Sequence, residues 1–470
     1  MKRIVFLLVA ITMTNFLSAQ TENYTVAIDS FQIYYNTENY NKIFNSFSPS
    51  MQQAVPLEKT KQFFTNLFHN VGKMETKEFV NYQGDMVAFY KVKFEKTILS
   101  IYISLDNQNK VRGLLVKPYE EETNADNRTV NALDSYPKDI AEILFDKVKG
   151  FPNGTQLSIA VIDQSETKYY GIIKENDSIK PIGNQDKVFE IGSITKVFTS
   201  TVLASLVLEN KLKLTDNINS YFPFEFKDNA QISFESLANH TSGLPRLPEN
   251  MDLSNKSNPY ISYGKNEIED YLKNYLKPKN DTSVTYSYSN LGAGLLGYTL
   301  GLSQKTTFRN LLQTKIFNKY KMTNSYTSSE NLEKVLIKGL DEKGNEVSNW
   351  DFDVFFSAGG ILSSAEDLAK FAEAQFDQKN KELTLTREPT FTINDQMKIG
   401  LGWHILNSQH GSSVVWHNGG TGGYSSSMVV DVENKFALIV LSNVSGFNPK
   451  MKNIDGLCFE LTKKLDDKLL

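Results

Sequence analysis

The stretch FEIGSITKVFTSTVLASLVLENKL, residues 189–212, has the apolar pattern of a buried helix, yet it carries Lys196 three residues after Ser193. Charged side chains rarely lie in apolar surroundings without a partner or a chemical task. Residues three apart share a helix face, and burial lowers the pKa of a lysine until its amine can be neutral. A neutral amine can take the proton of a serine hydroxyl, which is a poor nucleophile without a base. The pair therefore predicts a nucleophile at Ser193 and a base at Lys196.

The spacing alone is weak, because Ser-x-x-Lys occurs four times in the chain. The four pairs are Ser135/Lys138, Ser165/Lys168, Ser193/Lys196 and Ser262/Lys265. Only Ser193 follows a predicted strand and opens an apolar helix, directly after Gly192. The N–H groups at a helix start have no partner within the helix and can bind a developing oxyanion. The alternative is a structural cap, in which Ser193 only satisfies the start of the helix.

A second motif is TYSYSNLGAGLLG, residues 285–297, a polar turn that leads into a helix of small residues. Tyr288 offers a phenol that can relay a proton. Asn290 offers an amide that can hold both a lysine and a substrate carbonyl. The alternative for Tyr288 is a core aromatic side chain with a hydrogen-bonded hydroxyl. Tyr-x-Asn also occurs at Tyr34/Asn36, so this motif is weak by itself.

The third motif is VVWHNGGTGGYSSSMVV, residues 414–430, a strand that ends in His417 and Gly419. Glycine inside a strand pattern often marks the close approach of a ligand or of another backbone. The N–H group of Gly420 could then supply a second oxyanion donor beside that of Ser193. The alternative is a glycine-rich hairpin with a surface histidine.

These motifs in this order resemble the serine hydrolases of the class C β-lactamase and penicillin-binding-protein superfamily. The resemblance covers residue 136 to the end, and it extends to SLANHTSGLP (236–245), FFSAGGILSSAEDLAKF (355–371) and GLGW (400–403). It implies that Ser193 becomes acylated, that Lys196 and Tyr288 share the base role, and that water then releases the acyl group. It further implies an oxyanion and substrate-binding set of Asn290, His417, Gly419 and Gly420. His240, in the HTSGL stretch, would have a structural role near the rim.

The resemblance implies no metal and no cofactor. At His417 this chain departs from the lactamases, which carry a lysine there, and a histidine at neutral pH is largely uncharged. We therefore expect an exported serine hydrolase that acts on esters or D-amino-acid peptides, with a small-molecule or peptide substrate. The alternatives are a β-lactamase proper and a slowly acylated penicillin-binding sensor without turnover.

Composition and the N-terminal sequence indicate which partners, location and cross-links to expect. The chain has 470 residues and a net charge of −4, which gives no electrostatic basis for nucleic-acid binding. Residues 1–19 have the basic start, apolar run and small residues of a signal peptide, which predicts a periplasmic or secreted protein without a transmembrane span after cleavage. The only cysteine, Cys458, allows no internal disulfide.

The expected organisation is an accessory domain at 20–120, a polar linker at 121–135 and the hydrolase domain at 136–470. In the accessory domain, helical spacing precedes alternating strands, which is typical of a small α+β unit and resembles the cone-shaped nuclear-transport-factor-like modules. The hydrolase domain has strands near both ends and helices between them. The fold class is therefore α/β (α+β), with a β-lactamase/transpeptidase-like antiparallel sheet flanked by helices and a helical subdomain.

Overall fold

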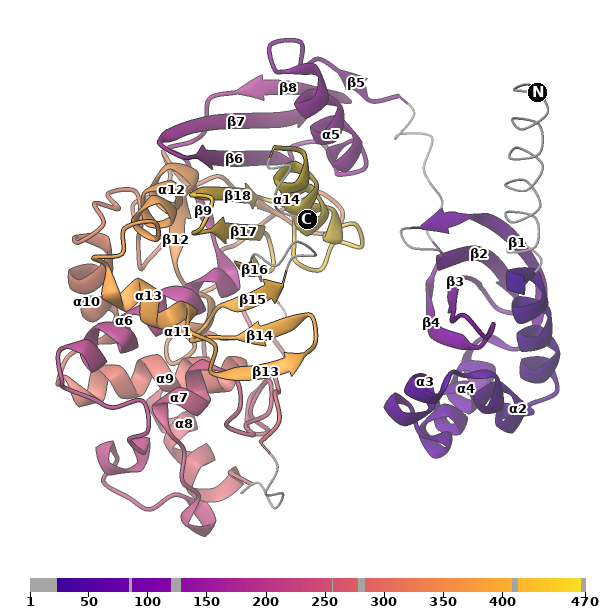
Figure 1. The fold of residues 1–470 in the computed structure, drawn as a ribbon, viewed down its shortest axis with the longest axis horizontal. Coiled ribbons are helices and arrows are strands. Elements are labelled where there is room, and N and C mark those ends of the chain that lie inside the picture. Colours follow the sequence, from indigo (N-terminus) through magenta and orange to yellow (C-terminus); the bar gives the residue numbers. More distant parts are fainter. Residues whose placement is uncertain are drawn as a thin grey trace, which may run out of the picture. The chain divides into compact units, whose positions relative to one another are not determined.

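The computed structural model describes residues 23–83, 87–119, 128–255, 257–277, 284–407 and 413–465 (Figure 1). The chain divides into two compact units, Met1–Thr123 and Asn124–Leu470. The predicted signal peptide at 1–19 and positions 121–127 of the predicted linker lie outside the described residues. The remainder of that linker belongs to the second unit, because Val130–Asn131 forms a strand there that pairs with Ser178–Ile182.

The first unit is a four-stranded antiparallel sheet, in the order β1-β2-β3-β4, with helices on one face. Its strands are β1 (Met74–Gln83), β2 (Val87–Phe94), β3 (Ile98–Leu105) and β4 (Val111–Pro118). Its helices are one over residues 23–36, α2 (Tyr40–Ser46), α3 (Pro49–Ala54) and α4 (Leu57–Val71). Alternate side chains of β2, including Tyr90, Val92 and Phe94, are buried in this core. The predicted α+β architecture is confirmed.

The second unit is built on a ten-stranded sheet in the order β13-β14-β15-β16-β17-β18-β6-β7-β8-β5. Its strands are β5 (Val130–Asn131), β6 (Gln156–Asp163), β7 (Glu166–Glu175), β8 (Ser178–Ile182), β13 (Phe391–Asn394), β14 (Met397–Ile399), β15 (His404–Asn407), β16 (Ser413–Gly420), β17 (Ser425–Asp431) and β18 (Phe436–Ser442). The ladders are antiparallel except between β5 and β8. Since β18 pairs with β6, the sheet joins the two ends of this unit, as the sequence predicts.

The two faces of this sheet bury different helices. On one face, α5 (Lys138–Val148) and α14 (Lys452–Leu465) cover the strands, and Leu157 and Ile159 of β6 lie in that cluster. On the other face lies the larger helical layer, which buries Ala160 and Ile162 from the same strand. The strand period of two sends alternate side chains to opposite faces, so one strand serves both layers. The predicted antiparallel sheet flanked by helices is confirmed.

The larger layer is centred on α6 (Thr195–Leu208), most of whose residues are buried. Around it lie α7 (Phe234–Ala238), α8 (Lys265–Asp270), α9 (Asn290–Ser303), α10 (Phe308–Leu312), α11 (Phe356–Gly359), α12 (Ala365–Ala374) and α13 (Lys381–Arg387). A separate short ladder pairs β9 (Val188–Glu190) with β12 (Leu362–Ser364). This ladder leads the chain directly into Ser193 and the start of α6.

One sequence expectation needs correction, and one strand of the first unit was not predicted from the sequence. The helix expected to begin at Ser193 starts at Thr195, and Ser193 lies in a single 3-10 turn, Gly192–Ile194, just before it. Strand β1 did not emerge from the pattern of the first unit, because Met74–Gln83 is an edge strand whose charged residues obscure the alternation.

Candidate active site

A glycine turn places Ser193. Gly192 has φ +52°, in the left-handed region that residues with a Cβ rarely adopt. A Cβ on Gly192 would lie only 2.6 Å from the backbone nitrogen of Gly420. Glycine is therefore needed both for the conformation and for the close approach of β16. As a result, the Ser193 hydroxyl lies at the start of α6 and borders an open cleft.

Lys196 lies one turn further along and is 2% exposed. Its Nζ is 2.9 Å from Ser193 Oγ and donates a hydrogen bond to the carbonyl of Ala358 at 2.7 Å. Burial, with the nearby charge of Arg246 adding to it, holds the pKa of Lys196 well below its usual value. A neutral amine has two N–H donors and one lone pair. With Ala358 accepting from one donor, the lone pair is available to the serine proton.

Tyr288 faces the same pair. Lys196 Nζ lies 5.0 Å from the centroid of the Tyr288 ring. Burial raises the pKa of Tyr288, while the nearby Ser193 hydroxyl acts in the opposite direction. The phenol is therefore protonated at neutral pH and lies within reach of the serine oxygen. The structure brings Ser193, Lys196 and Tyr288 together, although they come from two distant segments of the chain.

His240 holds the turn that carries Tyr288. Its Nδ1 accepts a hydrogen bond from the backbone N–H of Ser289 at 3.2 Å, and its carbonyl accepts one from Ser287 at 2.8 Å. The His240 and Tyr288 rings lie 4.5 Å apart. The ring therefore fixes the residues on both sides of Tyr288, a structural role of the kind that the sequence resemblance implies.

The glycine strand lies against the nucleophile turn. A Cβ on Gly419 would lie 2.1 Å from the carbonyl oxygen of Ile191 and 2.8 Å from the backbone nitrogen of Ser193. The N–H groups of Ser193 and Gly420 thus lie on two backbones that meet without any side chain between them. Such paired donors can bind a negative oxygen as it develops on a carbonyl.

These groups open into a cleft of about 910 Å³. Its lining includes Ser193, Arg246, Tyr260, Tyr288, Asn290, Trp350, His404, Asn418, Gly419, Gly420 and Thr421. Asn290 begins α9, and its Nδ2 donates to the Tyr260 hydroxyl at 3.4 Å. Its Oδ1 is buried without a hydrogen-bond partner, so Asn290 does not hold Lys196 as the sequence suggested. Its predicted role in binding a substrate amide stays a prediction, and Oδ1 is the atom available for it.

The predicted substrate contact of His417 is not what the structure shows. His417 is 1% exposed, does not line the cleft, and hydrogen-bonds through Nδ1 to the carbonyl of Asn418 at 2.6 Å. Burial, with the neighbouring His404 and Lys196 adding to it, lowers the pKa of His417 well below its usual value. The ring is therefore neutral and lies 6.3 Å from the Tyr288 ring. Strand alternation turns it inward, where it supports the tyrosine.

Several cleft residues were not identified from the sequence, among them Arg246 and His404. Arg246 is exposed in the cleft, and its guanidinium carbon lies 5.3 Å from the Tyr288 ring centroid. His404 lines the cleft, with Nε2 2.9 Å from the Tyr286 hydroxyl, and burial lowers its pKa to about 4. Arg246 directly follows the SLANHTSGLP stretch, so its position beside a matched motif was the available signal. Among the described residues, no group of three or more His, Cys, Asp or Glu side chains could hold a metal ion.

Comparison with known proteins places this geometry in context. A family described as Beta-lactamase matches residues 152–460. A β-lactamase of Pseudomonas fluorescens is 28% identical over 260 residues, which are 53% of this chain and 69% of the relative. Protein flp of Staphylococcus aureus (strain MRSA252) is 24% identical over 279 residues, 56% of this chain and 54% of the relative. The chain thus spans little more than half the length of the second relative.

Solved structures agree on the fold. The β-lactamase/D-alanine carboxypeptidase from Pseudomonas syringae superimposes with a TM-score of 0.59 at 19% identity, over 70% of this chain and 98% of that one. A class C β-lactamase gives a TM-score of 0.58 at 18% identity, over 70% of this chain and 97% of that one. Residues 29–114, in the first unit, match a family described as Protein of unknown function (DUF3887), and this description names no activity.

Proposed function

The chain belongs to the β-lactamase family, and we propose that it is an exported serine hydrolase that works through an acyl-enzyme on esters or D-amino-acid amide bonds. The observation that carries the proposal is the meeting of Ser193 Oγ and Lys196 Nζ at 2.9 Å, beside Tyr288 and the two glycine-lined backbones. Each of these groups has a separate task in acyl transfer.

In the proposed reaction, the Lys196 amine takes the proton of Ser193 as the serine oxygen attacks the substrate carbonyl. The pKa of Lys196 is lowered and that of Tyr288 is raised, both chiefly by burial, so near neutral pH the amine is free to accept a proton while the phenol still holds one. The N–H groups of Ser193 and Gly420 hold the oxyanion. Tyr288 passes a proton to the leaving group and is reprotonated from Lys196. Water then repeats the sequence in reverse to release the acyl group.

Esters and D-peptides are favoured over β-lactams because His417, buried and neutral, offers no permanent cation at that position. The test is a substrate panel on one preparation: p-nitrophenyl acyl esters, D-alanyl-D-alanine peptides and β-lactams. Steady turnover of esters or D-peptides, with β-lactams slower, supports the proposal. Faster turnover of β-lactams would make the protein a β-lactamase proper, and a single stoichiometric burst would make it a sensor.

The position of Arg246 favours D-peptides over uncharged esters as substrates. It is exposed in the cleft, close to Tyr288, and can pair with the free carboxylate of a peptide substrate. We expect Arg246→Gln to lower kcat/KM for D-alanyl-D-alanine peptides by about ten- to a hundredfold, since a charge-assisted pair is lost. Turnover of an uncharged p-nitrophenyl ester should change by less than about threefold. Equal losses on both substrates would assign Arg246 to the catalytic step instead.

The glycine turn gives a separate prediction. Gly192→Ala would force a Cβ into the left-handed region and to within 2.6 Å of the Gly420 nitrogen, so the two oxyanion donors must move apart. We expect kcat for an ester to fall by about 10²- to 10³-fold, the usual effect of losing one oxyanion donor. Gly183→Ala is the matched control, because its Cβ would meet only the end of the Gln185 side chain at 3.8 Å. If the two variants had equal kcat, the oxyanion assignment would be wrong.

Export is the remaining part of the proposal, and it rests on the basic and apolar pattern of residues 1–19. Among the described residues, no helix is long and apolar enough to cross a membrane. N-terminal peptide mapping of the protein from the culture medium and the cell envelope is expected to find a new N-terminus near residue 20. A full-length N-terminus in the cytoplasmic fraction alone would contradict export.

A further inference from the structure

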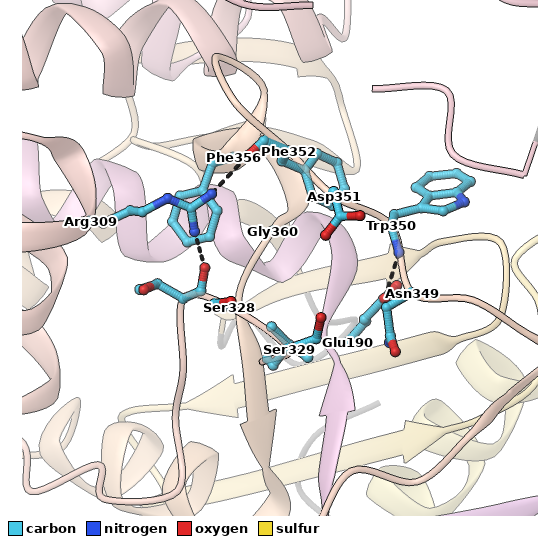
Figure 2. A pocket seen from close by; sticks show the side chains of 12 residues that line it. Glu190, Arg309, Ser328, Ser329, Asn349, Trp350, Asp351, Phe352, Phe356 and Gly360 are labelled. Carbon is cyan, nitrogen blue, oxygen red and sulfur yellow. Dashed lines mark hydrogen bonds between the residues drawn. The ribbon is translucent and has the colours of Figure 1, made fainter. Parts of the chain in front are cut away.

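Glu190 is a buried carboxyl group that the proposed reaction does not use. It is the last residue of β9, three residues before Ser193, and it is 4% exposed. It lines a second cavity of about 280 Å³ (Figure 2). The segment 349–352, Arg309 and Ser329 line the same cavity. Burying a carboxyl group costs folding free energy unless its hydrogen bonds compensate for the lost contact with water.

One oxygen of Glu190 holds the segment that carries Trp350. Glu190 Oε1 accepts hydrogen bonds from the backbone N–H of Trp350 at 3.0 Å and from Asn349 Nδ2 at 2.7 Å. Asn349 Nδ2 also donates to the Tyr424 hydroxyl at 3.0 Å. Figure 2 shows the Trp350 indole extending away from Glu190 while its backbone N–H is bound to the carboxyl group. The carboxyl group therefore anchors the backbone and leaves the ring available elsewhere.

The other oxygen faces the residue after the oxyanion glycine. Glu190 Oε2 and the Thr421 hydroxyl are both buried and both lack a hydrogen bond of ordinary geometry. They are close enough for Thr421 to influence the pKa of Glu190. Thr421 directly follows Gly420, so this contact reaches the end of the glycine strand.

Trp350 and Thr421 both belong to the catalytic cleft. Trp350 and Thr421 line it together with Ser193. The Trp350 ring lies 5.3 Å from that of Tyr260 and 6.1 Å from that of Phe447, and a Cβ on Gly422 would come within 2.6 Å of its Nε1. Trp350 is thus an aromatic wall of the cleft that is wedged against the glycine strand. Its backbone is fixed from behind by Glu190.

We propose that Glu190 is a positioning residue that fixes the Trp350 wall and the Thr421 end of the glycine strand, and so determines which acyl groups the cleft accepts. This proposal rests on the proposed hydrolase function. Because the carboxyl group touches neither the reacting atoms nor the cleft itself, it acts only through these two residues. Loss of the anchor should release the wall and leave the Ser193–Lys196 pair intact.

Hydrogen exchange tests the anchor without any assay of turnover. In Glu190→Ala, the backbone N–H of Trp350 is expected to exchange at least about tenfold faster than in the wild type, because its acceptor is gone, whereas that of Thr421, which donates to the Tyr424 carbonyl at 2.9 Å, should change less. Glu190→Gln keeps an acceptor at Oε1 and places an N–H donor opposite the Thr421 hydroxyl, so its exchange should match the wild type. Unchanged exchange in Glu190→Ala, or equal acceleration in both variants, would overturn the proposal.

An acyl series with a constant p-nitrophenol leaving group tests specificity. In Glu190→Ala, KM for the phenylacetyl ester should rise about tenfold, while KM for the acetyl ester changes less than about twofold. Trp350→Ala should give the same pattern, and Glu190→Gln should restore wild-type values. A uniform fall in kcat across the series would reduce Glu190 to a structural residue. If the wild type turns over neither esters nor D-alanyl-D-alanine peptides, the proposed function fails, and the exchange experiment still decides the anchor.

The pH dependence of stability tests whether the Glu190 carboxyl group is buried, because burial fixes the sign of that dependence. Burial raises the pKa of Glu190 from 4.5 to about 7, with Asp351 adding to the rise and the contacts of Thr421, Asn349 and Trp350 opposing it. Tyr424 and Arg309 are the other ionisable groups on the surrounding elements. Between these pH values the folded state binds more protons than the unfolded state, so stability falls as pH rises. The Tm of the wild type minus that of Glu190→Gln should decrease from about pH 5 to pH 8, and a constant or rising difference would contradict a buried Glu190.

Discussion

Ser193→Ala is expected to lower kcat/KM for a p-nitrophenyl acyl ester by about 10⁴-fold or more, because it removes the atom that forms the covalent bond. The Ser193 hydroxyl is half-buried, and methyl replaces it without a clash, so the fold should be retained. Residual hydrolysis from the oxyanion donors alone should remain above the rate in water. Steady-state kinetics, together with a thermal melt of the same preparation, measures both quantities.

The matched control for this variant is Ser165→Ala. Ser165 shares the Ser-x-x-Lys spacing, with Lys168 three residues later, but it lies at the exposed turn between β6 and β7. Its replacement should leave kcat/KM within about twofold of the wild type. If Ser193→Ala kept wild-type turnover, Ser193 would not be the nucleophile.

Lys196→Met is expected to separate catalysis from stability. Methionine is similar in length and uncharged, so it fills the same buried space without supplying a base. We expect kcat to fall by about 10³-fold, within the usual range for loss of a general base. Thermal stability should not fall, because a buried amine carries a desolvation cost that methionine lacks. A loss of activity explained entirely by unfolding would contradict this prediction.

The pH dependence of this pair has a defined sign. The pKa of Lys196 is lowered in the folded state, chiefly by burial, so kcat/KM of the wild type should rise as pH rises through that lowered pKa. Between that value and the ordinary pKa of lysine, the unfolded state binds more protons than the folded one. Stability of the wild type relative to Lys196→Met should therefore increase with pH over this window. The opposite slope would indicate a lysine that is charged in the fold.

The sequence predicted the catalytic trio and the sheet because both have local signals. Ser193 and Lys196 share one turn, and Tyr288 precedes a helix whose small residues permit close packing. The strands β16, β17 and β18 each contain a run of β-branched or other apolar residues, and most of their residues are buried, so the sequence predicts three consecutive strands. The family resemblance then supplied the order of the motifs. These features depend on residues that are neighbours in the chain.

The features that were missed depend on contacts between distant segments. Strand alternation separates His417 from Trp416 and Asn418, but which face of β16 borders the cleft is decided by how the strand lies against the distant turn Gly192–Ile194. Arg246 and Trp350 become cleft residues only when their loops meet beside Ser193. Glu190 reads as one more polar residue before the nucleophile until Asn349 and Trp350, about 160 positions later, are found bound to it.

The central claim is that Ser193 carries the acyl group during turnover, with Lys196 as the base that activates it. The most direct measurement is mass spectrometry of the protein quenched in acid while it hydrolyses an ester, followed by peptide mapping. We predict one acyl adduct per chain in the wild type, located at Ser193, and none in Ser193→Ala or, at short times, in Lys196→Met. An adduct at another residue, or undiminished turnover by a protein that never carries one, would contradict the account.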